Sequence, residues 1–548
     1  MEQSQPPTKN RLLFDFLACL LIILSHFANY IFYAGYARIF PDILVVLTLL
    51  GIVALGLTAL LQIPSRIFRA LIFAILITIV ISDALYEFGV AEISTRLVAL
   101  AATLLIVLAL AFLLRDHANK VLMGAFLAML CSTIAIAAFS SKDRASQTAA
   151  IPNKGDNALP IVVHLILDEH MGAAGMTKAL TGGEAMGRRM REFYKRAGFR
   201  LFSHAYSQYA ETAQSLTSAM NSDNDRFGAN HMTQRRYGFS LKNNAYLKAF
   251  SDLNYRINIV QSNYIDFCQT QQIRVANCVT YKPDNLRSPE IAGLPLAERV
   301  KLILNMYYSS LTLIKLIKYT ETLDERRSWP GPVLLSAAKA IGAQLWHGRV
   351  GPLAVATSFD QLVTDISRAK GGSLFFAHLL MPHYPYVYGP DCALRSPVSS
   401  WSQKHLPDGT NSSASRQKHY AEYFDQTRCV MRKLQRLFDT MKRAGTFKKS
   451  IIVIHGDHGA RISRASQLGA APSMADYIDR FSTLFAIKAP NIVPGTDARM
   501  VSLLQLLKFA TSRDARSLSA KAVPTVYGYD RKRGYSATVL PDFPGRAR

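Results

Sequence analysis

Five long apolar runs near the N-terminus constrain this chain more than any other feature. Each reaches the ~20 residues that a helix needs to cross a hydrocarbon core about 30 Å thick. They cover residues 12–34, 41–63, 67–86, 95–114 and 119–140. A chain with such runs cannot fold as a soluble single domain, a coiled coil or a disordered segment. The sequence therefore predicts a five-helix transmembrane domain over residues 1–140.

The charges in the short loops indicate how these helices are oriented. Basic residues dominate on one side, at Lys9, Arg11, Arg66, Arg69, Arg115 and Lys120. The loops on the other side carry a mixture, namely Arg38, Asp42, Glu87, Glu92 and Arg96. By the positive-inside rule, the N-terminus of this multi-pass inner- or plasma-membrane protein lies in the cytoplasm. Everything after residue 140 then lies outside the cytoplasm, in the periplasm or the extracellular space.

The strong basic charge of the chain belongs to its polar part. Residues 1–140 hold eight Lys/Arg and seven Asp/Glu, so they contribute only +1 to the formal net charge of +25. Nucleic acid is the usual partner of so basic a protein, but a domain outside the cytoplasm meets anionic lipid and phosphorylated glycan instead. We expect no nucleic-acid partner. The basic C-terminal region, 501–548, is interpreted either as a solvated surface or as a segment attracted to anionic lipid heads.

Beyond a polar linker at 141–160, short apolar runs alternate with helical patterns such as 185–197 and 418–443. Strands are expected at 161–167, 256–260, 373–380, 449–454 and 482–488. This alternation predicts an exported α/β domain with a parallel-type sheet over residues 161–500. An insertion at about 296–350 contains the segment 301–319, which is apolar with basic edges. This segment is either a core helix of the insertion or an amphipathic helix in the membrane interface.

Six cysteines divide between the two parts. Cys19 and Cys131 lie in predicted spans, where we expect them to be packing residues. The other four lie in the exported part, where an oxidising environment favours disulfides. We expect the pairs Cys268–Cys278 and Cys392–Cys429, although four cysteines allow three pairings.

Polar side chains follow three of the predicted strands at the point where each strand ends. Asp168 and Glu169 follow 161–167, and Asp457 and His458 follow 449–454 shortly after its last residue. The run 373–380 contains His378 and leads to His383. Ligands of open α/β sheets bind at the carboxyl ends of the strands. Carboxylates with imidazole suit zinc, with Mn or Ca as alternatives. The sequence therefore predicts a divalent-metal site on Asp168, Glu169, Asp457 and His458.

Thr212 begins a predicted helix that follows the strand-like segment 200–206. Taken alone, a threonine in this place is interpreted as an N-cap. The N-terminus of a helix also attracts phosphate or sulfate groups. A threonine hydroxyl is too weak an acid to ionise unaided, and coordination to a divalent metal would supply the missing stabilisation. Beside the predicted metal site, we interpret Thr212 as the nucleophile and as a further metal ligand.

These motifs resemble the alkaline phosphatase superfamily, and in particular its sulfatase-like membrane branch. That branch includes the lipid A phosphoethanolamine transferases and the lipoteichoic acid synthases. The matching residues are the acidic pair at 168–169, the Thr-x-x-Ser of 212–215, the His-x4-His-x-Pro of 378–385 and the Asp-His-Gly of 457–459. The residue after this last motif is Ala460 where the transferases have Glu, and Arg461 or Arg464 is our candidate to hold a phosphate oxygen instead.

The resemblance implies a metalloenzyme that transfers a phospho-substituent, of the phosphoethanolamine or phosphoglycerol type, from a membrane lipid to an envelope glycan or glycolipid. In this mechanism Thr212 attacks, while His383 and His378 bind the transferring oxygens or protonate the leaving group. The alternatives are a phosphodiesterase, phosphatase or sulfate-ester hydrolase of the same superfamily, and a non-catalytic degenerate relative. Formylglycine sulfatases need a C/S-x-P/A-S-R motif, and no cysteine begins one here, while Leu216 follows Ser215 where Arg is required.

Overall fold

The structure is a computed structural model. It describes residues 9–34, 40–63, 65–87, 93–114, 117–143, 157–223, 230–235, 238–270, 273–311, 350–401, 412–463, 472–512, 518, 523–530, 534–540 and 543. The chain divides into two compact units. The first comprises Met1–Gln147 and Ile291–Arg349, and the second comprises Thr148–Glu290 and Val350–Arg548.

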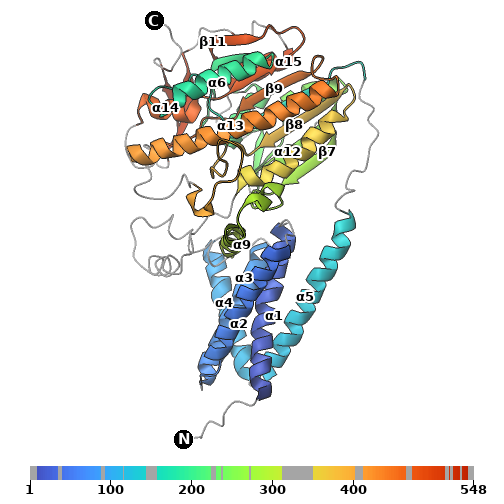
Figure 1. Cartoon of the computed structure of the whole chain (residues 1–548), viewed down its shortest axis with the longest axis vertical. Coiled ribbons are helices and arrows are strands. Elements are labelled where there is room, and N and C mark those ends of the chain that lie inside the picture. The colour runs from blue at the N-terminus through green and yellow to red at the C-terminus, as the bar shows by residue number, and fades with distance from the viewer. Residues whose placement is uncertain are drawn as a thin grey trace. The chain divides into compact units, whose positions relative to one another are not determined.

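Five helices form the N-terminal part of the first unit (Figure 1), as the apolar runs predict. They are α1 (Lys9–Ala34), α2 (Phe40–Leu60), α3 (Arg66–Glu87), α4 (Ile93–Leu114) and α5 (Ala118–Asp143). Among the described residues, three stretches are long and apolar enough to cross a membrane, Arg11–Phe32, Pro41–Leu60 and Asn119–Ile136, and Leu100–Leu114 is a shorter apolar stretch. Large apolar side chains such as Ile52, Leu105 and Leu113 face outward. Such a surface suits a lipid environment rather than water.

Helix α9 (Leu296–Ser310) belongs to this helical unit, although it comes from the predicted insertion at about 296–350, between strands of the α/β part. Arg299 forms an ion pair at 2.9 Å with Asp42, which is completely buried. The Tyr307 hydroxyl is hydrogen-bonded to His26 Nδ1 at 2.8 Å. The described part of the 301–319 segment is therefore packed against the membrane helices, and is not a core helix of the sheet domain. Residues 312–349 lie outside the described part of the chain.

An eight-stranded sheet in the order β11-β2-β10-β9-β1-β8-β5-β7 forms the centre of the second unit. Its strands are β1 (Val162–Leu167), β2 (Arg200–Tyr206), β5 (Arg256–Ser262), β7 (Val275–Tyr281), β8 (Ser373–Leu379), β9 (Ile451–Gly456), β10 (Phe485–Lys488) and β11 (Gly495–Ser502). All five predicted strands are present. The sheet is mixed rather than parallel, because β10 runs antiparallel to both β9 and β2. Helix α14 (Met474–Phe481) lies between β9 and β10 in the chain, and the two strands are neighbours that run in opposite directions.

Helices cover both faces of this sheet. Helices α6 (Gly183–Arg196), α12 (Gly351–Ser367) and α13 (Ser413–Arg443) form one layer, which lies in front of the sheet in Figure 1. Helices α7 (Thr212–Asn221), α8 (Ala245–Asp252) and α15 (Leu503–Ser512) form the other. Val162 and Ile166 of β1 pack into the core with α7, α8 and α15, whereas Val163 and Leu165 point to the opposite face and are also buried. Burial on both faces explains why the strands are continuous apolar runs in the sequence.

Much of the segment after residue 500 is part of this domain. Leu506 and Leu507 of α15 lie in the core, and β12 (Thr525–Asp530) pairs with β13 (Gly534–Val539) in a hairpin. The side chain of Val526 is buried against Phe481 and its neighbours. The interpretation of a solvated or lipid-attracted segment rests on basic residues that lie outside the described part of the chain, so it stays a prediction. These residues are Arg513, Arg516, Lys521, Arg531, Lys532, Arg533, Arg546 and Arg548.

Candidate active site

The ends of β1, β8 and β9 bring the predicted site residues to one edge of the sheet. In the strand register, Leu167 of β1 is level with Leu379 of β8 and with Gly456 of β9. Asp168 and Asp457 are the next residues of their strands, so they leave the sheet side by side. The carboxyl end of the parallel strands is where ligands of α/β folds bind. The structure therefore brings these residues together at the edge of the sheet that the sequence predicts, and their roles stay predictions.

Asp457 connects the acidic loop after β1 to the histidine beside it. Its Oδ1 accepts hydrogen bonds from the backbone N–H groups of Glu169 at 3.0 Å and His458 at 2.9 Å. Its Oδ2 lies 3.0 Å from His458 Nε2. Burial alone would raise the pKa of Asp457, but His458 holds it well below its usual range. Gly459 allows this packing, because a Cβ there would lie 2.1 Å from the Asp479 carbonyl oxygen.

Thr212 is the first residue of α7, and its hydroxyl points at this pair. Thr212 Oγ1 lies 3.2 Å from His458 Nε2. The other ring nitrogen of His458 donates to the Gly459 carbonyl oxygen at 2.9 Å, which fixes the orientation of the imidazole. Ser215 Oγ donates to the Asp457 carbonyl oxygen at 2.6 Å and so docks α7 on the end of β9. The N-cap of α7 is Glu211, so the simpler interpretation of Thr212 as an N-cap is wrong.

Glu169, in the acidic loop after β1, forms an ion pair with Arg461. The Arg461 guanidinium donates to Glu169 Oε1 at 2.8 and 3.2 Å and to Glu211 Oε2 at 2.8 Å. Glu169 has a φ of 63° and Arg461 a φ of 53°. This left-handed conformation costs a non-glycine residue about 1–2 kcal/mol, and such cost is typical of functional sites. Arg461 is one of the two arginines that the sequence suggests for this position; Arg464 lies outside the described residues.

The two histidines of the His-x4-His-x-Pro motif occupy different positions. His378 is completely buried on β8, and its Nε2 donates to Asp168 Oδ2 at 3.2 Å. His383 lies in the loop after β8, with Nε2 3.9 Å from Glu169 Oε1 and a fifth of its side chain exposed. His383 can therefore reach a substrate, whereas His378 is completely buried and hydrogen-bonds Asp168.

Two overlapping groups of side chains could hold a metal ion. The ligand atoms of Asp168, Asp457 and His458 all lie within 4.8 Å of one another, and so do those of Asp168, Glu169 and His383. Asp168 Oδ1 is buried and has no hydrogen-bond partner among the described residues. A buried carboxylate oxygen in this state is costly unless a cation neutralises it. Carboxylate oxygens with an imidazole nitrogen are suitable ligands for zinc or manganese, so the residues fit a divalent metal.

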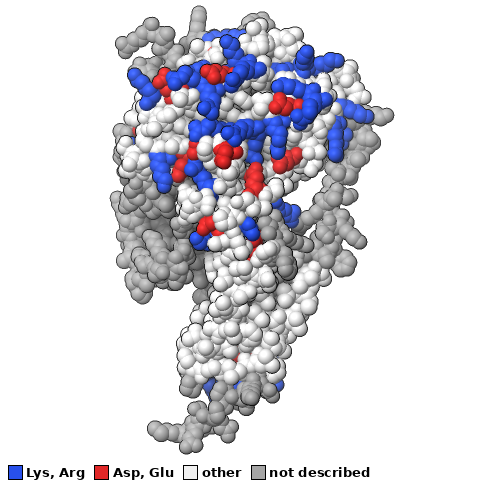
Figure 2. All heavy atoms as spheres, viewed as in Figure 1, with Lys and Arg blue, Asp and Glu red and all other residues white. Residues whose placement is uncertain are grey.

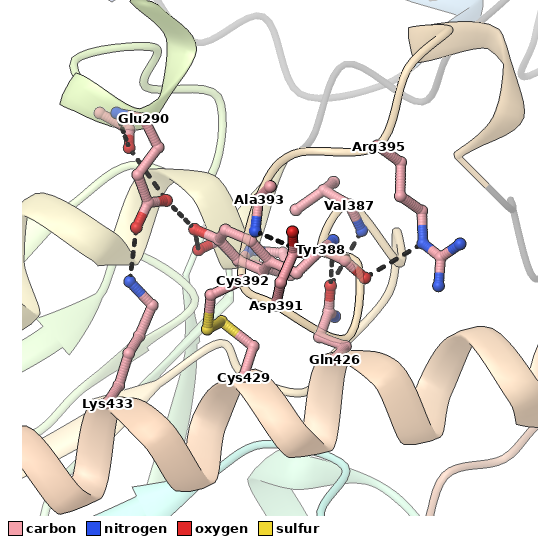
Figure 3. The surroundings of a disulfide bond; sticks show 12 residues. Glu290, Val387, Tyr388, Asp391, Cys392, Ala393, Arg395, Gln426, Cys429 and Lys433 are labelled. Atoms are coloured by element: carbon pink, nitrogen blue, oxygen red, sulfur yellow. Dashed lines mark hydrogen bonds and ion pairs between the residues drawn. A yellow bond between two sulfur atoms is a disulfide. The ribbon is translucent and has the colours of Figure 1, made fainter. Parts of the chain in front are cut away.

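A buried glutamine holds the loop that carries His383 (Figure 3). Gln426 of α13 accepts a hydrogen bond from the Val387 N–H at 2.9 Å. Its side-chain amide donates to the carbonyl oxygens of Pro382 at 3.0 Å and His383 at 2.7 Å. The disulfide Cys392–Cys429 ties the far end of the same loop to α13. This disulfide and Cys268–Cys278 confirm both predicted pairings. Of the two remaining cysteines, Cys19 is buried, but Cys131 is exposed, contrary to its predicted packing role.

Replacing Gln426 with leucine is expected to lower kcat for phosphate-ester turnover about 10- to 100-fold, the usual effect of losing a supporting hydrogen-bond partner. The apolar leucine side chain is of similar volume, but it leaves the buried backbone groups of the His383 loop without their hydrogen-bond partner. Turnover of a chromogenic phosphodiester measures the effect, and bound metal should be unchanged. Gln435→Leu is the matched control, because Gln435 lies on the same helix and bonds only Asp439 on its surface. Equal activity of the two variants would contradict a positioning role for Gln426.

Sequence reasoning missed three residues that shape the site: Gln426, Glu211 and Tyr423. The Tyr423 hydroxyl donates to the Glu169 carbonyl oxygen at 2.9 Å and accepts from the Met171 N–H at 2.8 Å. Tyr423 and Gln426 lie in the amphipathic pattern of α13, where buried polar residues look like ordinary core positions. Their partners are more than 35 residues away in the chain, so no local pattern identifies them.

The chain is similar in part to several proteins of known structure. No curated protein matches the chain. The C-terminal periplasmic domain of EcEptC from Escherichia coli, in complex with Zn, is 13% identical over 72% of this chain and 97% of that chain, with a TM-score of 0.39. The phosphonate monoester hydrolase of Agrobacterium radiobacter is 11% identical over 68% of this chain and 82% of that chain, with a TM-score of 0.38. Similarity at this level carries no inference about activity.

The family model described as Sulfatase matches residues 163–507. This match spans more than half of the chain and contains every residue of the candidate site. The chain therefore belongs to the sulfatase family, and it is an enzyme of the alkaline phosphatase superfamily.

Proposed function

We propose that this protein is a membrane-anchored metalloenzyme that transfers a phospho-substituent, of the phosphoethanolamine or phosphoglycerol type, from a lipid to an envelope glycan or glycolipid. The observation that carries the proposal is the position of Thr212, with its hydroxyl 3.2 Å from His458 Nε2 at the N-terminus of α7 and beside a cluster of buried carboxylates. A hydroxyl in this environment is suited to attack an anionic ester.

Each residue of the site has its own role in the first step. A divalent cation held by Asp168, Glu169, Asp457 and His458 would lower the pKa of the Thr212 hydroxyl. Thr212 Oγ1 then forms a bond to the donor phosphorus as the bond from phosphorus to the lipid oxygen breaks. His383 Nε2, which is partly exposed, gives a proton to the leaving oxygen. Arg461 hydrogen-bonds an oxygen of the transferring group, and His378 positions Asp168.

The second step regenerates the enzyme. A hydroxyl of the acceptor sugar attacks the phosphorus of phospho-Thr212 and gives its proton to His383 Nε2, which lost one in the first step. The bond from phosphorus to Thr212 Oγ1 breaks at the same time. The apolar helices support a lipid as the donor, since they would keep the domain at a bilayer surface. The loop charges support an N-terminus in the cytoplasm and a catalytic domain in the periplasm or outside the cell.

The main alternative is hydrolysis, in which water rather than a sugar takes the group from Thr212. A sulfate-ester hydrolase of the formylglycine type is disfavoured, because the nucleophile position holds threonine. The S-x-A-S-R match at 412–416 lies at the start of α13 and not at that position. A degenerate, non-catalytic relative is disfavoured by the assembled site. Hydrolysis and transfer use the same residues, so the fate of the group decides between them.

The test follows headgroup-labelled phosphatidylethanolamine and phosphatidylglycerol through the reaction of the full-length protein in bilayer discs with an envelope glycolipid acceptor. Transfer predicts label in the glycolipid, together with unlabelled diacylglycerol. Label released only as a water-soluble phosphate ester would instead assign hydrolysis. If Thr212→Ala reacts as fast as the unmodified protein, the proposed chemistry is wrong.

A further inference from the structure

A basic groove lies between α6 and α13, away from the strand ends that form the active site. It encloses about 520 Å³, and Phe193 and Met431 contribute apolar surface to its wall. Five arginines line it: Arg188, Arg189 and Arg196 from α6, and Arg428 and Arg432 from α13. Figure 2 shows Lys and Arg gathered on the face that these two helices form. No residue lining the groove belongs to the active site described above.

The positive charge of the groove is only partly neutralised. Arg188 pairs with Glu184, and Arg428 pairs with Asp425. No ion pair within the described part of the chain involves Arg189, Arg196 or Arg432, and Glu192 is the single acidic residue in the lining. Burial lowers the pKa of Arg428, and the charges of Arg189 and Arg432 lower it further. These arginines therefore repel one another, and a bound anion would relieve the repulsion.

The side chains that line the groove indicate which class of ligand it can bind. A guanidinium group binds phosphate or sulfate through two parallel hydrogen bonds, which a lysine cannot do. The volume lies within the ~300–1,000 Å³ typical of small-ligand sites. The Arg428 side chain is 30% exposed and lines the groove, so a ligand that enters the groove can reach it. Phe193 and Met431 are almost completely buried, so the arginines supply most of the accessible surface of the groove.

We propose that the groove between α6 and α13 binds a phosphate- or sulfate-bearing oligosaccharide through Arg189, Arg428 and Arg432. Binding at this accessory site would keep an anionic glycan on the exported domain while other parts of the same chain are free to reach the active site. The proposal does not depend on the chemistry at Thr212.

The test measures binding of a fluorescent heparin hexasaccharide, as a sulfated probe, to the full-length protein in discs of neutral lipid. All proteins carry Thr212→Ala, so that binding is measured without turnover. The double substitution Arg189→Gln and Arg432→Gln is expected to weaken binding at least about tenfold, because two charged hydrogen-bonding partners are lost. A neutral hexasaccharide should not bind.

The matched control is the double substitution Arg436→Gln and Lys442→Gln, which removes the same charge from the same domain. Arg436 and Lys442 lie on α13 outside the groove and pair with Asp360 and Asp439. Binding should change less than about twofold in this control. Equal weakening in both pairs would show a general charge effect and overturn the proposal, as would unchanged binding in the groove variant. If the groove substitutions weaken binding to vesicles with 30 mol% phosphatidylglycerol (roughly an anionic membrane) but not to the saccharide, the assigned ligand is wrong.

Discussion

Replacing Thr212 with alanine is expected to reduce turnover of a phosphate ester by roughly a thousandfold or more, because the nucleophile itself is removed. Thr212→Ser keeps a hydroxyl at the same helix terminus and should retain measurable activity. Trapping the reaction early in the unmodified protein should show a covalent phospho-adduct on the peptide that contains Thr212. Intact-mass measurement and peptide mapping of the three proteins check both expectations.

Thr217→Ala is the matched control for this experiment. Thr217 lies on the same helix and is completely buried. Within the described part of the chain, its hydroxyl makes one weak hydrogen bond, to Met232 Sδ at 3.8 Å. The same chemical change there should leave labelling intact. Covalent labelling that persists in Thr212→Ala, or that maps to another peptide, would rule out Thr212 as the nucleophile.

Asp457→Asn is expected to weaken divalent-metal binding at least about a hundredfold and to abolish turnover. The Asp457 carboxylate uses Oδ1 to accept two backbone N–H groups and directs Oδ2 toward His458 Nε2. An asparagine has one oxygen, which the same N–H groups would keep, so its NH₂ group would then face the metal position. Metal content after dialysis, measured by mass spectrometry, checks the prediction.

Chelation of the unmodified protein gives the complementary result. Removal of the metal should stop turnover, and titration with Zn, Mn and Ca identifies the ion that restores it. Asp439→Asn is the control for nonspecific loss of a carboxylate, because Asp439 lies on α13 and pairs only with Gln435 and Lys442 at the surface. Full metal content and full activity in Asp457→Asn would refute the assigned ligand set.

The sequence could predict the elements whose signal is local. An apolar run of membrane length or a strand buried on both faces is visible in consecutive residues, so the five helices and the strands β1, β5, β8, β9 and β10 could be placed in advance. The acidic residues after β1 and β9 could be predicted to lie close together, because parallel strands of one sheet end at the same edge. Thr212 could be added because a helix start is also a local signal.

The features that could not be predicted from the sequence depend on contacts between segments that are distant in the chain. The antiparallel direction of β10 depends on where the chain returns after β9, and the position of α9 depends on partners such as Asp42, which lies 257 residues earlier in the chain. Arg461 was visible as a candidate, but its pairing with Glu169 and Glu211 was not. The arginines of α6 and α13 form one groove only because the two helices pack side by side. The sequence by itself determined which residue types follow the ends of the strands, since each of them comes directly after its own strand in the chain. The tertiary structure decided which of these residues contact one another, since that depends on packing between segments far apart in the chain.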